Sequence, residues 1–360
     1  MRREEKGMNM DGRPMRPSRP RTPHCRWLLT LPVVVAAVVV GCTSSSSRPV
    51  RLSADRVLGP LPVPAGNPQT PEKVELGKLL FFDKRLSATN TMACASCHDP
   101  AKGWSDGLPR SAGLRREEDR NSISLFNSAY EDFPAWDGFA ASLEEHNAGA
   151  ITFGDNAMSQ NVPDLIRELS AVPQYRDRFG KVFGGEISFT NVIRALAAFE
   201  RSLLTFDSAF DRFQAGDRSQ LTKEQQEGLA LFGGKAGCSS CHAPPLFTDN
   251  RFHALGVLQA GPLAEDPGRF AITGDEADRG AFRTPTLRNV TLTAPYMHDG
   301  VLATLDDVIA FYDAGGGAVP GLTGREIGPL HLSPQERKAL VAFLVSLTDT
   351  TGDTRVPAVP

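Results

Sequence analysis

Two short runs of cysteine and histidine constrain this 360-residue chain more than any other feature. Both have the form C-x-x-C-H: Cys94, Cys97 and His98 make the first, and Cys238, Cys241 and His242 make the second. In this pattern two thiols add to the vinyl groups of a c-type haem, and the histidine that follows binds the iron. A zinc site would need four ligands spaced to close a tetrahedron. The two runs therefore predict two covalently attached c-type haems.

The segments around these motifs predict a mainly α-helical, loop-rich fold. Thr70 followed by Pro71 is typical of a helix start, and apolar residues continue from there toward the first motif. Capping boxes that begin at Thr222 and Ser333 predict one helix before the second motif and one near the C-terminus. Strand-like alternation is hard to find. Two further helical stretches are expected at residues 162–179 and 188–213.

A helix followed by C-x-x-C-H occurs twice, and Cys238 follows Cys94 by 144 residues. We therefore expect two cytochrome-c-like lobes, each built around one haem. The expected divisions are a signal peptide (1–41), a tether with an N-terminal extension (42–69), an N-terminal haem domain (70–215), a C-terminal haem domain (216–348) and a tail (349–360).

The N-terminus has the layout of a bacterial lipoprotein signal peptide. Its first 26 residues carry eight basic side chains against three acidic ones, and an apolar stretch too short to span a bilayer comfortably follows. Cys42 comes directly after Val-Val-Gly, which resembles a lipobox, so we expect lipid on Cys42; an ordinary signal peptide is the alternative. Serine-rich residues 43–47 favour a flexible tether. Thr43 favours an anchor in the outer membrane, on the periplasmic side.

The six cysteines are then all accounted for. Cys25 lies in the expected signal peptide, Cys42 takes lipid and four take haem, so none is left for a disulfide, although export would permit one. The net charge is −3 with a basic N-terminus, so the rest of the chain is mildly acidic. It has no basic stripe, which excludes nucleic acid as an expected partner. The membrane is expected to be contacted through the lipid alone.

Three further runs resemble the bacterial di-haem cytochrome c peroxidase and MauG superfamily. They are the W-D-G run in residues 133–138, the T-P-T-L-R-N run in residues 283–289 and the P-Y-M-H-D-G run in residues 294–300. The resemblance extends over residues 70–348. It implies a haem-dependent oxidoreductase that uses H2O2, with the N-terminal haem domain as the peroxidatic one.

The residue that distinguishes the branches of this superfamily lies fourteen positions after His298, and here it is Tyr312. Peroxidases have methionine at this place, and MauG-type enzymes have tyrosine. A thioether favours reduced iron, whereas an anionic phenolate favours iron in high oxidation states. The resemblance therefore implies His242 and Tyr312 as axial ligands of the second haem. The alternative is Met297 as ligand, with Tyr312 as a core residue.

The surroundings of the first haem indicate the same branch. The superfamily's peroxidases have a histidine that blocks the first iron, and it falls here at Gly113; residues 111–121 contain no histidine. The resemblance thus implies an open sixth position at the His98 haem, ready for peroxide without prior reduction. It also implies that Trp136 relays electrons between the haems, although tryptophan is equally common as a core residue.

The superfamily holds a calcium ion between its haems. Asn121, Thr293 and Pro295 fall at its ligand positions, the last two through backbone carbonyl groups. Oxygen donors are what Ca²⁺ prefers. The resemblance therefore implies a Ca²⁺ site.

Two departures from the superfamily pattern matter. Its distal glutamine and glutamate positions hold His146 and Asn156, so the usual carboxylate is missing. We expect His146 to be the distal acid/base. The alternatives are that His146 is a sixth iron ligand, or a surface residue with Glu145 or Asp155 serving instead. The second departure is Ala236, where MauG has a tryptophan that passes oxidising equivalents to its partner.

Ala236 argues against the substrate of MauG itself. A lipoprotein with a tyrosine ligand resembles instead the MbnH branch, which oxidises a tryptophan of a partner protein. The expected function is a MauG/MbnH-like enzyme in which H2O2 produces a two-haem high-valent state that oxidises an aromatic residue, a tryptophan, of a partner protein. One alternative is a peroxidase that takes electrons from a small cytochrome. Another is a non-enzymatic di-haem electron carrier. His253 and His331 are expected to be structural, and His298 to shape the second pocket.

Overall fold

A computed structural model describes residues 52–153, 157–263, 265–317, 327–352 and 354–360. The predicted mainly helical, loop-rich fold is confirmed, and the described residues form one compact unit. The helices are α1 (Ala54–Val57), α2 (Pro71–Phe81), α3 (Leu143–Thr152), α4 (Val162–Ala171), α5 (Pro173–Phe183), α6 (Phe189–Glu200), α7 (Ala209–Gln214), α8 (Lys223–Gly233), α9 (Phe270–Thr273), α10 (Leu305–Asp313) and α11 (Pro334–Val345). Two strands, β1 (Phe252–His253) and β2 (Phe282–Arg283), pair antiparallel.

Short 3-10 helices connect these elements. They are η1 (Lys84–Leu86), η2 (Cys94–Ser96), η3 (Pro100–Lys102), η4 (Ser128–Tyr130), η5 (Arg218–Gln220), η6 (Cys238–Ser240), η7 (Glu276–Asp278) and η8 (Val290–Leu292). Both C-x-x-C-H motifs thus begin in a 3-10 turn, which brings two cysteines three positions apart onto one short loop.

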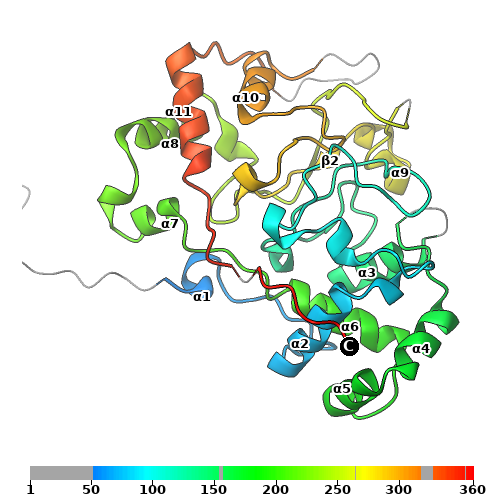
Figure 1. Ribbon diagram of the computed structural model, residues 1–360. Coiled ribbons are helices and arrows are strands. Elements are labelled where there is room, and N and C mark those ends of the chain that lie inside the picture. Colours follow the sequence, from blue (N-terminus) through cyan, green and yellow to red (C-terminus); the bar gives the residue numbers. More distant parts are fainter. Residues whose placement is uncertain (1–51, 154–156, 264, 318–326, 353) are drawn as a thin grey trace, which may run out of the picture. The chain divides into compact units, whose positions relative to one another are not determined.

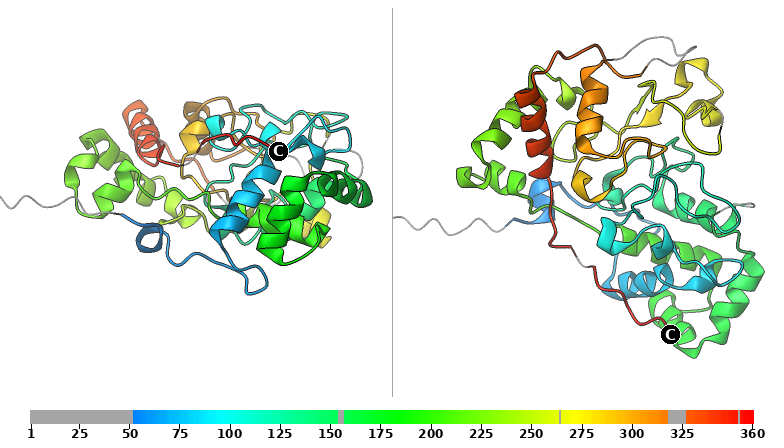
Figure 2. Two further views of the ribbon diagram at one scale, coloured as in Figure 1. Left: turned by 60° about the horizontal axis from the view of Figure 1, so that its bottom comes forward. Right: turned by 45° about the horizontal axis from the view of Figure 1, so that its top comes forward.

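Two pairs of crossing helices form the scaffold. α2 packs across α6, and α8 packs across α11 (Figures 1 and 2). A Cβ atom on Gly77 of α2 would lie 1.9 Å from the Ala195 carbonyl oxygen, and a Cβ on Gly228 of α8 would lie 1.9 Å from that of Ala339. Each crossing therefore needs a glycine, because only a residue without a side chain permits so close an approach.

The buried apolar side chains form two clusters, one around each helix pair. The first runs from Leu76 to Leu203, and the second contains Phe210, Phe232, Phe343 and Leu347. Phe210 packs in the second cluster, so the apolar cores divide a few residues before the predicted limit at 215/216. The division into domains stays a prediction. The C-terminal tail ends against the first lobe, where Arg85 donates to the Pro360 carbonyl at 2.8 Å.

The helix starts predicted from capping signals are confirmed. Thr70, Thr222 and Ser333 cap α2, α8 and α11 by accepting backbone N–H groups. The stretch predicted at 162–179 is two helices, α4 and α5, because Pro173 starts a new one. The stretch at 188–213 is likewise α6 and α7.

Several N-terminal predictions lie outside the described residues. These are the signal peptide, Cys25, the lipid site Cys42, Thr43 and the serine-rich tether; Asp155 and Asn156 are also outside. Among the residues that the structure describes, no helix has the length and apolar character needed to cross a membrane.

Candidate functional site: two haem pockets

The first motif presents one imidazole nitrogen of His98 for a ligand. Its Nδ1 lies 3.0 Å from the Trp104 carbonyl oxygen, to which it donates when it carries the proton. Ser122 Oγ lies 3.3 Å from the same nitrogen and donates to the Cys97 carbonyl at 2.6 Å. Burial lowers the pKa of His98, which favours the neutral ring. Nε2 is left for iron, as in histidine ligands whose other nitrogen is bonded to a carbonyl.

The second motif repeats this arrangement with a different partner. His242 Nδ1 lies 2.8 Å from the Phe247 carbonyl oxygen, and burial lowers the pKa of His242. The donor set of each site, two cysteines of a turn and a neutral imidazole, fits a c-type haem. The four motif cysteines form no disulfide.

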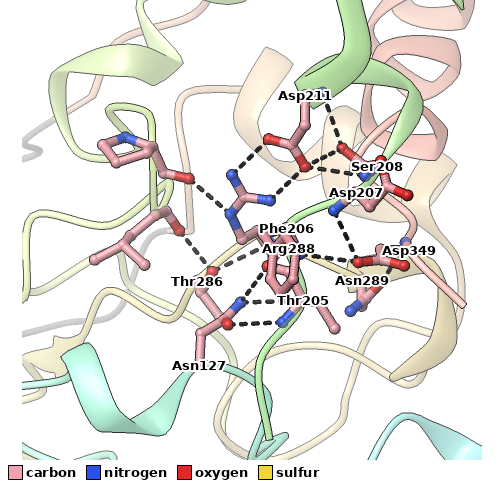
Figure 3. Close-up of polar contacts among 12 residues, drawn as sticks. Asn127, Thr205, Phe206, Asp207, Ser208, Asp211, Thr286, Arg288, Asn289 and Asp349 are labelled. Carbon is pink, nitrogen blue, oxygen red and sulfur yellow. Dashed lines mark hydrogen bonds and ion pairs between the residues drawn. The ribbon is translucent and has the colours of Figure 1, made fainter. Parts of the chain in front are cut away.

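The loop that holds His242 is fixed by the T-P-T-L-R-N run. Arg288 Nε donates to the Pro245 carbonyl at 2.7 Å, and Thr286 Oγ1 donates to the Leu246 carbonyl at 2.6 Å (Figure 3). Arg288 also forms two bonds, of 2.8 and 2.9 Å, to the carboxylate of Asp211 in α7. The run thus positions the second histidine and ties it to the segment that joins the two cores.

A cavity of about 530 Å³ adjoins the second motif. Cys238, Cys241 and His242 line it together with Tyr312 of α10. Its size lies in the range of cofactor pockets. Apolar walls come from α8, α10 and α11, namely Phe232, Leu305, Val308, Ile309, Leu340 and Leu344. The cavity therefore fits a haem held by the second motif.

Both candidate sixth ligands line this cavity. Burial raises the pKa of the Tyr312 phenol, and the nearby Cys238 and Cys241 thiols raise it further. Met297 is also among the lining residues, as is His298, which stacks on Phe282 with 3.7 Å between ring centroids. The structure brings the predicted residues together, and the role of Tyr312 as ligand stays a prediction.

Trp136 lies in the wall of the same cavity and is held at both ends. Its indole Nε1 donates to the Asn121 carbonyl at 2.9 Å, and its own carbonyl accepts the Arg283 N–H at 2.8 Å. A side chain fixed in this way keeps one distance to each haem. This suits a relay, which stays a prediction for Trp136.

The three predicted calcium ligands belong to the lining of the same cavity. Asn121, Thr293 and Pro295 all line the cavity. The amide nitrogen of Asn121 donates to the Leu108 carbonyl at 2.8 Å, which leaves Oδ1 as the donor for an ion. These oxygen donors fit Ca²⁺, and the site itself stays a prediction.

His146 lies on α3, within electrostatic reach of the first motif. Burial, the charge of His98 and that of Arg283 lower the pKa of His146 to about 4. Its ring stacks on Phe139 with the centroids 5.4 Å apart. Glu145 is instead exposed, and its carboxylate accepts the Ala141 N–H at the helix start. His146 is therefore a neutral proton acceptor near the first haem, and its catalytic role stays a prediction.

Sequence reasoning missed Glu200, a second titratable group near the first motif. The side chain is buried on α6 and accepts a hydrogen bond of 2.9 Å from Asn147, the neighbour of His146. Burial raises the pKa of Glu200 to about 8, and its charge is felt at Cys94. The signal that could have found it is an acidic residue at the end of an apolar run, a place where a buried side chain is expected.

These features define a class: a mainly helical, loop-rich di-haem protein. The chain belongs to the di-haem cytochrome c peroxidase and MauG family, whose model, described as di-haem cytochrome c peroxidase, matches residues 71–219. It is 41% identical over 357 residues to cytochrome-c peroxidase IdrP1 of Denitromonas iodatirespirans, with 89% of this chain and 93% of that protein covered. It is 38% identical over 356 residues to methylamine utilization protein MauG of Methylorubrum extorquens, with 93% and 100% covered.

Among solved structures, the chain resembles a MauG-like protein associated with microbial copper homeostasis. The TM-score is 0.74 at 35% identity, with 81% of this chain and 93% of that chain covered. The diheme peroxidase BthA of Burkholderia thailandensis matches with a TM-score of 0.69 at 27% identity, covering 79% and 87%. The protein is thus a di-haem, haem-dependent oxidoreductase with H2O2 as oxidant, as the family predicted from the sequence implied.

Proposed function

We propose that this enzyme uses H2O2 to oxidise an aromatic side chain, a tryptophan, of a partner protein, in the manner of the MauG/MbnH-like branch. The observation that carries the proposal is Tyr312, which lines the second cavity together with His242. A phenolate ligand stabilises oxidised iron, so it suits a haem that stores oxidising power.

The haems, held by His98 and His242, would supply the two electrons that H2O2 needs, together with two protons from solvent, to become two molecules of water. His146 is neutral because the pKa is lowered to about 4, so it accepts a proton from the incoming peroxide and returns it to the departing oxygen. Trp136, held by Asn121 and Arg283, carries electrons between the two pockets. The partner's side chain then restores the two electrons.

Two further parts belong to the proposal. Ca²⁺ bound by Asn121, Thr293 and Pro295 would fix the Asn121 carbonyl that accepts the indole N–H of Trp136. Lipid on Cys42 would hold the enzyme at the periplasmic side of a bacterial membrane, in reach of an exported partner.

The second candidate is a peroxidase that reduces H2O2 with electrons from a small cytochrome. Met297 favours it, because this thioether also lines the cavity, and the cytochrome c551 peroxidase of Nitrosomonas europaea is 35% identical over 305 residues. The non-enzymatic alternative falls away, since the relatives are peroxidases and MauG.

The deciding experiment adds one equivalent of H2O2 to the purified protein with both haems in the ferric state. Absorption and Mössbauer spectra should show two oxidising equivalents stored over both irons without prior reduction. A Tyr312→Met variant should lose this storage, whereas Met297→Leu should keep it. A requirement for prior reduction by a donor cytochrome would favour the second candidate instead.

A further inference from the structure

Arg283 carries a buried positive charge whose hydrogen bonding is incomplete. Its side chain is 0% exposed and lines the cavity beside the second motif. Nη1 makes one long contact of 3.4 Å to the Thr284 carbonyl, but within the described part of the chain neither Nε nor Nη2 makes a hydrogen bond. Buried N–H groups without an acceptor are rare and costly. Donors in this state beside a cavity indicate an acceptor that binds there.

The ion pair that Arg283 makes is similarly incomplete. Nη2 lies 3.1 Å from Oε2 of Glu131, whose side chain is 4% exposed. Burial raises the pKa of Glu131, and its Oε1 has no hydrogen-bond partner among the described residues. Removing a pair of ions from water costs hydration free energy. Their attraction offsets that cost only when further hydrogen bonds satisfy both groups.

The second buried arginine shows what a purely structural arginine looks like in this fold. Arg288 is 1% exposed, and all three of its guanidinium nitrogens are bonded, to Asp211 and to the Pro245 carbonyl. Arg283 is equally buried and leaves two nitrogens without a hydrogen bond. The difference between the two therefore calls for an anion at Arg283.

The position of Arg283 identifies the anion. The residue lines the cavity that fits the second haem, its backbone N–H holds the Trp136 carbonyl, and its charge helps to lower the pKa of His146 near the first haem. A guanidinium group matches a carboxylate, and the carboxylates that a haem brings into a protein are its propionates.

We propose that Arg283 binds a propionate of the second haem, with Glu131 holding the guanidinium, and that the two opposite charges set the potential of that haem. Nε and Nη2 donate to the propionate. A nearby positive charge disfavours oxidised iron and raises the reduction potential, and a nearby negative charge lowers it. This proposal needs the haem but does not depend on which partner the enzyme oxidises.

The test is a spectroelectrochemical titration of the full two-haem protein. Arg283→Gln should lower the reduction potential of the second haem, Glu131→Gln should raise it, and Arg283→Lys should fall between Arg283→Gln and the parent. Mass spectrometry should find two haems on each variant chain. The matched control is Arg279→Gln, because Arg279 lines the same cavity but is partly exposed and paired with Glu276, so its potential shift should be small.

Two outcomes would overturn the proposal. One is that Arg283→Gln shifts the second potential no more than the control does. The other is that Arg283→Gln and Glu131→Gln shift it in the same direction, as a merely structural disturbance would. If Arg283→Gln fails to fold, the double variant with both substitutions keeps a neutral pair of similar shape. Its potential should lie below that of Glu131→Gln alone, and equality would equally reject the proposal.

Discussion

The two lobes share a scaffold and differ in what surrounds each haem. Gly77 contacts Ala195 in the first lobe as Gly228 contacts Ala339 in the second, and Ala339 lies 144 positions after Ala195. Phe199 and Phe343 match at the same offset, but the next residue differs, since Glu200 of the first lobe corresponds to Leu344 of the second. The helix crossing and the C-x-x-C-H motif are therefore repeated, while the buried acid of the first lobe is replaced by an apolar leucine in the second.

The proposed function assigns a different task to each lobe. Two titratable groups, His146 and Glu200, lie near the first motif, where the proposed cleavage of the O–O bond needs proton transfer. The cavity beside the second motif holds the phenol of Tyr312 next to the apolar side chains of α8, α10 and α11, which suits the proposed storage of oxidising power. The substitutions below test whether each task belongs to its own lobe.

The largest expected effect is at His146. His146→Ala should slow the reaction with H2O2 by about 10²–10⁴-fold, the usual contribution of a general acid/base. Because the neutral ring is the active form and its pKa is about 4, the parent rate should be flat at neutral pH and fall as the pH drops through about 4. Stopped-flow absorption at the first haem measures this. The exposed His331 of the second lobe, changed to Gln, is the control and should leave the rate unaltered.

An unchanged rate in His146→Ala would show that His146 does not transfer the proton in the reaction with H2O2. A variant that instead gains a high-spin first haem would indicate that His146 is an iron ligand in the parent. The two results are distinguishable in the resting absorption spectrum.

The buried Glu200 of the first lobe should make the protein's free energy of unfolding depend on pH. The pKa is raised from 4.5 to about 8 by burial, so the unfolded chain releases this proton at lower pH than the folded one. The stabilisation is complete below about pH 4.5 and is lost as the pH rises through about 8, by on the order of 4 kcal/mol. Glu200→Gln should abolish this loss, as guanidinium unfolding at pH 5 and pH 9 can measure.

The second lobe offers the matched comparison for this prediction. Glu200→Leu copies Leu344 and should also remove the pH dependence, although it leaves Asn147 without its acceptor. A parent protein whose stability is equal at pH 5 and pH 9 would show that Glu200 is not the buried acid described.

The shared scaffold makes the next prediction symmetrical. Gly77→Ala and Gly228→Ala should each destabilise the protein by about 3 kcal/mol, because each new Cβ meets a backbone oxygen at 1.9 Å. Gly180→Ala in α5, where nothing lies within 4 Å, should instead stabilise it by about 0.5–1 kcal/mol. Unequal costs at Gly77 and Gly228 would show that the two crossings are not equivalent.

The sequence predicts those parts of the structure that depend on contacts between residues close together in the chain. The starts of α2, α8 and α11 depend on side chains within three residues of each other, so their caps were visible. The starts of α3 and α10 carry similar signals, at Ser142 and Thr304, which the prediction passed over.

The parts of the site that were not predicted depend on contacts between distant segments. The hydrogen bond of Glu200 needs α3 to pack on α6, and the pair of Arg283 with Glu131 joins strand β2 to the end of η4. No local pattern encodes such contacts. The haem attachment was predictable because its chemistry fixes a five-residue spacing, and the family resemblance extended it to Tyr312 and Trp136.

The smallest expected effect compares the helix caps of the two lobes. Thr70 caps α2 with one bond, in which it accepts the Lys73 N–H at 3.3 Å. Thr222 caps α8 within a capping box, since it accepts the Gln225 N–H at 3.2 Å while Gln225 Oε1 accepts the Thr222 N–H at 2.9 Å. Each threonine changed to alanine should cost about 1 kcal/mol, as measured by denaturant unfolding.

The comparison becomes sharper with the partner residue of the box. Gln225→Ala should cost a few tenths of a kcal/mol beyond its own propensity, because it removes the reciprocal bond of α8. In the cap of α2, Lys73 donates only its backbone N–H. The first lobe therefore has no counterpart of the Gln225 side chain that a substitution could remove. An effect of Gln225→Ala as large as that of Thr222→Ala would mean that the second lobe's helix start depends on both bonds equally. The lobes would then differ in how their scaffold begins, as well as in what surrounds their haems.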